Sequence, residues 1–221
     1  MSSPALHPDV REHVAALARL SEMALELGGE SLPSRLEWAG CRAELAALEL
    51  FTEHAPGVYS MPVILPDACR YMRQWANKWE YRVNEEEEPE YQIPEIALKH
   101  RHPPTYEECA QVFDEVLRPA FNVLYRLDPE NITSIQLARY TPDNTSKGNW
   151  HRDEDSDCTA VVNLGSQHVG GGTRLFVAGQ SVHVPPLPIG HALLFLGRTT
   201  LHCGSEVLEG QRDLLVFWST L

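Results

Sequence analysis

The stretch Ile132-Thr-Ser-Ile-Gln-Leu-Ala-Arg-Tyr140 marks a change in the pattern of the chain. Three of its first four residues are β-branched, and such residues favour extended structure. Further short apolar segments follow it, separated by turns of Gly, Pro, Asn or Asp, at 158–164, 173–177, 181–184, 192–196 and 214–218. Short strands at such close spacing are typical of a sandwich or barrel. The C-terminal part of the chain is therefore predicted to be an all-β sandwich or barrel.

The first quarter of the chain is predicted to be helical. Apolar residues recur at helical spacing over residues 9–27, and Gly28-Gly29 ends the pattern. A second helix is expected from a capping box at Ser34 to the break at Ala55-Pro56-Gly57. The two helices would pair as a hairpin, which predicts a helical extension over residues 1–55.

The middle of the chain mixes both patterns. A strand is expected over residues 58–65, followed by a helix from Pro66 through Trp79. A capping box at Thr105 predicts a long helix through Leu124, with a kink at Pro119. Between these helices the acidic block Glu85–Glu90 is expected to be a solvated loop because like charges repel.

The composition limits the function classes. The chain has 221 residues, 43% of them apolar, and a formal charge of 18 − 31 = −13. This length is enough for one folded domain with an appended segment. No apolar stretch approaches the length of a membrane span. A pI near 5.2 makes nucleic-acid binding unlikely, since such binding needs a cationic surface.

The cysteines bear on location. The chain has five, without a CxxC pair, and the N-terminus lacks the basic and apolar regions of a secretory signal. We therefore expect free thiols and an intracellular protein, cytoplasmic or nuclear.

A candidate metal site lies in the β-rich part. His151-Arg152-Asp153 is an HxD triplet, and on a strand its first and third residues would point to the same face. His202, at a later strand, would complete two His and one carboxylate on one face of an octahedral ion. Such a facial triad leaves three positions open and is typical of non-haem Fe(II) enzymes. A structural zinc site would need a fourth ligand. An HxD triplet alone is a weak signal, so the surrounding sequence decides.

That surrounding sequence resembles the prolyl 4-hydroxylase-like branch of the Fe(II)/2-oxoglutarate-dependent dioxygenases. The similar segments occur in family order, at 139–153, 159–164, 170–176, 188–195, 201–207 and 209–218. Residues 58–79 also resemble the start of the family's domain. The resemblance implies an α+β fold with a double-stranded β-helix (jelly-roll) core flanked by helices. It places this domain at residues 56–221, with residues 1–55 outside it as a helical extension.

The resemblance also implies roles for individual residues. It implies that the iron ligands are His151, Asp153 and His202. Arg212 would pair with the distal carboxylate of 2-oxoglutarate, a task that suits a guanidinium because its fork binds a carboxylate bidentately. The remaining residues expected beside the co-substrate are Tyr140, Asn163 and Thr173.

The implied activity is hydroxylation of an unactivated C–H bond, with release of succinate and CO₂. The cofactors would be Fe(II), 2-oxoglutarate and O₂, with ascorbate as a candidate reductant. The expected substrate is a protein or peptide side chain such as proline, and the alternative is a small molecule. Nucleic acid ranks low because the dealkylating relatives carry a second Arg where this chain has Trp218. The acidic charge is compatible with a basic protein partner.

Two other functions remain open at this point. One is a cupin-like iron dioxygenase that does not use 2-oxoglutarate, against which Arg212 in its Gly-x-Arg setting argues. The other is a non-catalytic metal-binding module, against which the intact triad argues.

Overall fold

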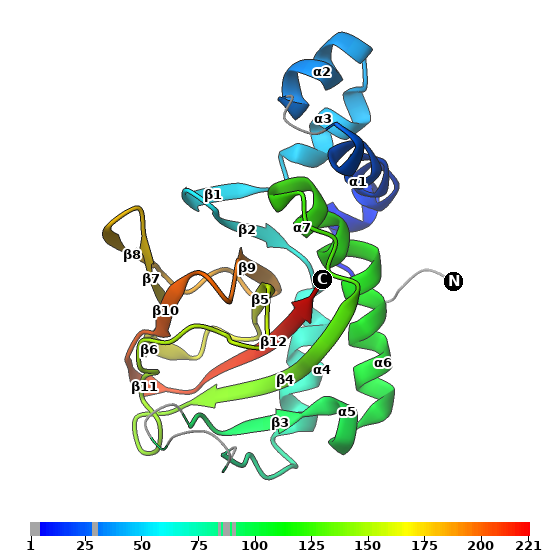
Figure 1. Ribbon diagram of the computed structural model, residues 1–221. Coiled ribbons are helices and arrows are strands. Elements are labelled where there is room, and N and C mark those ends of the chain that lie inside the picture. The colour runs from blue at the N-terminus through cyan, green and yellow to red at the C-terminus, as the bar shows by residue number, and fades with distance from the viewer. Residues whose placement is uncertain (1–4, 28–30, 84, 86–88, 90–91) are drawn as a thin grey trace.

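A seven-stranded antiparallel sheet forms the centre of the molecule in the computed structural model, which describes residues 5–27, 31–83, 85, 89 and 92–221. Helices cover one face of this major sheet, and a three-stranded sheet lies on the other side (Figure 1). The strand order of the major sheet is β1 (Thr52–Ala55), β2 (Val58–Pro62), β9 (His191–Phe195), β5 (Cys158–Asn163), β12 (Arg212–Thr220), β4 (Asn131–Tyr140) and β3 (Glu95–Ala97). The prediction of an α+β fold is thus confirmed.

Two smaller sheets complete the β structure. The minor sheet has the order β10 (Leu201–Gly204), β7 (Thr173–Val177) and β8 (Gln180–Val184). A two-stranded ribbon pairs β11 (Val207–Gly210) with β6 (His168–Gly170). All these pairings are antiparallel.

The helices share one large apolar core with the major sheet. They are α1 (Pro8–Glu26), α2 (Leu32–Ala39), α3 (Arg42–Leu48), α4 (Pro66–Ala76), α5 (Leu98–Arg101), α6 (Pro103–Val112), the π-helical segment η1 (Phe113–Leu117) and α7 (Arg118–Tyr125). Leu17 of α1 and Phe121 of α7 are fully buried in the same cluster as Phe217 of β12. In the part of the chain that the structure describes, no helix is both long and apolar enough to cross a bilayer.

The prediction of one helix from Ser34 to Ala55 is wrong. Gly40 divides it, because its left-handed backbone (φ +69°) caps α2 and its N–H bonds to carbonyls of the last turn. The first helix of the pair starts at Leu32, two residues before the expected cap. The last residues of the predicted extension, 52–55, form strand β1, which pairs with β2 across a turn at Gly57 (φ +76°).

The helices before β1 pack directly on the rest of the molecule. Leu6 forms a β-bridge with Ile64, and Asn122 Nδ2 of α7 donates a 2.8 Å hydrogen bond to Ser21 Oγ of α1. The division into an extension and a domain stays a prediction, with residues 52–55 belonging to the major sheet. Gly28-Gly29, expected to end the first helix, and most of the Glu85–Glu90 block lie outside the described residues.

The long helix expected from Thr105 to Leu124 starts earlier and changes type midway. It begins at Pro103, where the His102 imidazole rather than Thr105 accepts the capping hydrogen bond, at 3.2 Å. Pro119 has no N–H to donate to the preceding turn, and the chain adopts the wider π-helix just before it. The predicted kink is therefore a π-helical segment.

Candidate metal centre

The structure brings the three predicted metal ligands together. Asp153 Oδ1 lies 3.6 Å from His151 Nε2 and 3.5 Å from His202 Nε2. Among the residues that the structure describes, these three form the one group whose ligand atoms could share a metal ion. These donors, two imidazoles and one carboxylate, fit a divalent metal ion.

The backbone arrangement differs from the regular strand expected for the HxD triplet. His151 forms an isolated antiparallel bridge with His202, and each N–H donates to the other residue's carbonyl at 2.9 Å. Asp153 lies beyond this bridge, and its N–H donates to the carbonyl of Gly197 at 3.2 Å. The pairing with β10, rather than strand alternation, therefore sets the triad.

Both imidazoles are oriented by backbone carbonyls. His151 Nδ1 lies 2.7 Å from the carbonyl of Asn149, and His202 Nδ1 lies 2.9 Å from that of Thr200. A carbonyl only accepts, so Nδ1 carries the hydrogen and Nε2 keeps its lone pair. Each Nε2 is the atom that faces Asp153. The two histidines are thus held in the tautomer that binds a metal.

Burial and charge set the protonation states of the site. Burial alone would raise the pKa of Asp153, but its interactions with His151 and His202, when these are protonated at low pH, leave it below its usual value. Burial lowers the pKa of His202. At neutral pH the site therefore holds an ionised carboxylate and a neutral imidazole, the forms that coordinate metals. The His151 side chain is 29% exposed, against 2% for Asp153, so solvent reaches the triad from the His151 side.

The register of the major sheet connects the triad with Arg212. On the face turned away from the helices, Thr159 lies opposite Phe195 of β9 and Trp218 of β12. The Phe195 ring contacts the His202 ring at 4.5 Å between centroids. Six residues before Trp218, the start of β12 places Arg212 opposite Tyr140 of β4. The triad and Arg212 thus occupy one face, at opposite ends of β12.

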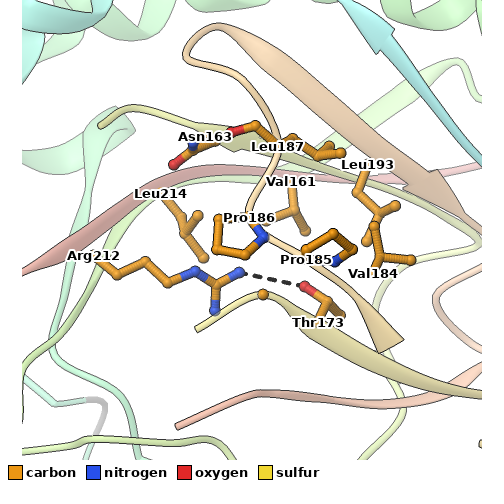
Figure 2. Close-up of a pocket in the computed structure, with 11 residues that line it drawn as sticks. Val161, Asn163, Thr173, Val184, Pro185, Pro186, Leu187, Leu193, Arg212 and Leu214 are labelled. Atoms are coloured by element: carbon orange, nitrogen blue, oxygen red, sulfur yellow. Dashed lines mark hydrogen bonds between the residues drawn. The ribbon is translucent and has the colours of Figure 1, made fainter. Parts of the chain in front are cut away.

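Arg212 lines a narrow pocket together with residues of the major and minor sheets (Figure 2). Its side chain is almost fully buried, and Nη2 donates a 3.3 Å hydrogen bond to Thr173 Oγ1 (Figure 2). The guanidinium carbon lies 5.4 Å from the centre of the Tyr140 ring. Nη1 is buried without a hydrogen-bond partner among the described residues, and burial lowers the pKa of Arg212. A buried cation with a free donor is suited to an anionic ligand.

Asn163 also lines this pocket but is engaged with the protein. Its Nδ2 donates to the carbonyl of Leu187, and its Oδ1 accepts from the N–H of Gly165. It therefore anchors the segment of Pro185 and Pro186 that lines the pocket (Figure 2). The cavity left is about 20 Å³, room for about one water.

Two further residues border the triad and were not singled out from the sequence. Thr159 Oγ1 lies 2.6 Å from Asp153 Oδ2. A side chain at Gly197 would come within 2.9 Å of the same carboxylate oxygen. In the sequence Thr159 is one β-branched residue of a strand, and nothing in its local pattern marks it as a neighbour of Asp153.

Comparisons with known proteins agree with this fold. No protein-family model matches the sequence, and no curated protein matches it significantly. A prolyl 4-hydroxylase from Pseudomonas putida is similar in structure with a TM-score of 0.57 at 22% identity, over 76% of this chain and 94% of that one. The non-haem α-ketoglutarate-dependent carbocyclase SnoK of nogalamycin biosynthesis has a TM-score of 0.56 at 18% identity, over 75% of this chain and 80% of that one.

A third structure extends further along the chain. It is a Trichoplax adhaerens prolyl hydroxylase in complex with a peptide fragment of hypoxia inducible factor, with a TM-score of 0.61 at 15% identity, over 94% of this chain and 91% of that one. Residues 56–221 are only 166 of the 221, about three quarters, so this match includes part of the first 55 residues. The chain has the fold of the 2-oxoglutarate and Fe(II)-dependent oxygenases, and the resemblance seen in its sequence is confirmed at this level.

Proposed function

We propose that the protein is an Fe(II)- and 2-oxoglutarate-dependent oxygenase, with iron held by His151, Asp153 and His202. The observation that carries the proposal is that this triad and Arg212 lie on the same face of the major sheet. A metal site alone would fit many functions. A buried guanidinium with an unpaired Nη1 supports a carboxylate ligand as the second component.

Each residue of the pocket then has a task. Arg212 and Thr173 would bind the distal carboxylate of 2-oxoglutarate through Nη1, Nη2 and the hydroxyl. Tyr140 packs against the guanidinium. Asn163 would hold the pocket-lining segment through Leu187 rather than contact the co-substrate directly. The pocket must widen to admit 2-oxoglutarate, because its present volume is that of about one water.

The chemistry comes from the bound groups. Iron with 2-oxoglutarate and O₂ supplies the oxidation of a C–H bond, with succinate and CO₂ as co-products and ascorbate as a candidate reductant. The chain contributes neutral imidazoles, an ionised carboxylate and apolar walls. These walls, lined by Val161, Leu193 and Leu214, keep water from the co-substrate.

The substrate we propose is a protein or peptide side chain, with proline as the first residue to test. The peptide-bound Trichoplax structure supports this choice. A small molecule is the second candidate, supported by the comparable similarity to the carbocyclase SnoK. Trp218 lies in the row of side chains next to the triad and would form part of the substrate wall.

The remaining parts of the proposal concern architecture and location. We place the chemistry in a double-stranded β-helix core formed by the major and minor sheets. The cysteines of the described chain are all free, which suits an intracellular compartment, cytoplasmic or nuclear. A basic protein is a candidate partner for so acidic a chain.

The test is conversion of 2-oxoglutarate to succinate, measured with Fe(II), O₂ and ascorbate against a panel of peptides and metabolites. We expect turnover by the wild type and none by His151→Ala or Asp153→Ala. His100→Ala, an exposed histidine on α5, is the matched control and should retain it. Near-normal succinate formation by both triad variants would refute the proposal. Iron-dependent O₂ consumption without 2-oxoglutarate would favour the cupin-like alternative.

A further inference from the structure

The carboxylate of Asp153 has two oxygens in different surroundings. Oδ1 faces the Nε2 atoms of His151 and His202, at 3.6 and 3.5 Å. Oδ2 points away from them and lies 2.6 Å from Thr159 Oγ1. One oxygen is thus directed at the metal site, and the other is bound to the protein.

The carboxylate that accepts from it fixes the direction of the Thr159 hydroxyl. An ionised carboxylate only accepts, so Thr159 donates its hydrogen to Asp153. Ser156 Oγ lies 2.9 Å from Thr159 Oγ1, donates to the carbonyl of Cys158 at 2.8 Å and accepts a 3.2 Å hydrogen bond from the N–H of Ser219. Residues 156, 159 and 219 are at most 1% exposed, so water does not compete for these bonds.

The backbone around these hydrogen bonds leaves little space. A tight turn, closed by the bond from Ser156 N–H to the carbonyl of Asp153 at 3.1 Å, brings Ser156 back beside Thr159. Gly197 covers the other side, where a Cβ would lie 2.9 Å from Asp153 Oδ2 and closer still to Thr159 Oγ1. The carboxylate therefore cannot rotate without breaking the bond to Thr159.

We infer that Thr159 is a positioning residue that restricts Asp153 to binding the metal through Oδ1 alone. The inference rests on the proposed metal site and adds a requirement to it. A facial triad leaves three positions for other ligands only if each residue contributes one atom. A carboxylate that bound through both oxygens would take one of those positions. Thr159 thus keeps open a position that the co-substrate needs.

The experiment uses Mn²⁺ as the probe and isothermal titration calorimetry as the readout, so it does not depend on turnover. Metal-free wild type is compared with Thr159→Val, which removes the hydroxyl, and Thr159→Ser, which keeps it. We expect Thr159→Val to bind Mn²⁺ about 10- to 100-fold more weakly, as is typical when a partner of a metal ligand is lost. Thr159→Ser should bind Mn²⁺ almost as the wild type does.

A second titration separates positioning from simple loss of metal. 2-Oxoglutarate is added to each protein at saturating Mn²⁺, where all sites are filled. We expect Thr159→Val to bind it more weakly than the wild type and Thr159→Ser to restore the affinity. Ser156→Ala removes the hydroxyl beside Thr159 together with its bonds to the Cys158 carbonyl and the Ser219 N–H. It should show a smaller change in the same direction and serves if Thr159→Val does not fold.

The matched control is Ser21→Ala, which also removes a buried hydroxyl that is hydrogen-bonded, here to Asn122. It lies on α1, away from the triad, and should leave both affinities unchanged. Wild-type affinities in Thr159→Val, or equal losses in Thr159→Val and Ser21→Ala, would overturn the inference while leaving the metal site intact. A wild type that binds no Mn²⁺ would refute the proposed function as well.

Discussion

Replacing Arg212 by Met should make the ligand-free protein more stable and abolish its response to 2-oxoglutarate. The guanidinium is 4% exposed, and its one hydrogen bond among the described residues goes to Thr173 at 3.3 Å. Nη1 has no partner there. The removal of such a charge from water costs several kcal/mol. A single bond to a neutral hydroxyl and a contact with Tyr140 at 5.4 Å offset only part of that cost.

The magnitude follows from this balance. Replacement of buried ion pairs by apolar side chains of similar volume has stabilised proteins by about 1–4 kcal/mol, and Arg212 has no carboxylate partner among the described residues to offset its burial. We expect Arg212→Met to gain an amount in this range, and each kcal/mol raises the melting temperature by about 2–4 °C for a chain of this size. At 2-oxoglutarate concentrations about 100-fold above the dissociation constant, the wild type should gain about 2.7 kcal/mol and the variant nothing.

Urea unfolding of the Mn²⁺-loaded proteins, with and without 2-oxoglutarate, measures both effects. Arg212→Lys is the matched control, because it keeps the charge but loses the bidentate fork, and it should retain a reduced response to the ligand. The reasoning is refuted if Arg212→Met is less stable than the wild type without ligand, or if 2-oxoglutarate stabilises both proteins equally.

Three further predictions concern the surroundings of the site. Gly197→Ala should destabilise the protein by about 1–3 kcal/mol and weaken Mn²⁺ binding, because the added Cβ would overlap Thr159 Oγ1 and Asp153 Oδ2. An unchanged urea midpoint and an unchanged Mn²⁺ affinity would contradict this. Asp213→Asn should lower the free energy of unfolding in urea by about 3–5 kcal/mol. The reason is that the Asp213 carboxylate accepts from Arg73 and Arg139 at 2.8 and 2.7 Å and is 1% exposed. A loss below about 1 kcal/mol would be inconsistent with a paired buried charge. Burial lowers the pKa of His54, His168 and His191 below 6.5, so the unfolded chain binds protons more readily than the folded one. The free energy of unfolding should therefore fall as the pH decreases through 6.5. A free energy of unfolding that does not change with pH over this interval in the metal-free protein would contradict the prediction.

The parts of the fold that were predicted correctly have strong local patterns. The apolar face of α1 repeats at helical spacing, and three of the first five residues of β4 are β-branched. The strand β1 lacks such a pattern because it is a mostly exposed edge strand that pairs on one side only. Its four residues, Thr52–Ala55, become a strand through pairing with β2, a contact that their own composition does not indicate.

The site shows the same division. His151, Asp153 and Arg212 could be identified because the chemistry of their side chains and their order in the sequence suggested a role. The hydrogen bond of Thr159 to Asp153 could not be predicted, because it depends on a turn at Ser156 and on the position of β5 beside the triad. Asn163 was expected beside the co-substrate, and it does line the pocket. Its bond to Leu187 depends on where the segment between β8 and β9 folds back, which no local pattern predicts.

The central claim is that the triad holds an Fe(II) ion to which 2-oxoglutarate binds. The most direct test is anaerobic addition of 2-oxoglutarate to protein loaded with one equivalent of Fe(II), followed by visible absorption. The account predicts a weak charge-transfer band in the wild type that is absent in Asp153→Ala and, at 2-oxoglutarate concentrations that saturate the wild type, also absent in Arg212→Met. A wild type without the band, or a band of equal strength in Asp153→Ala, would contradict it.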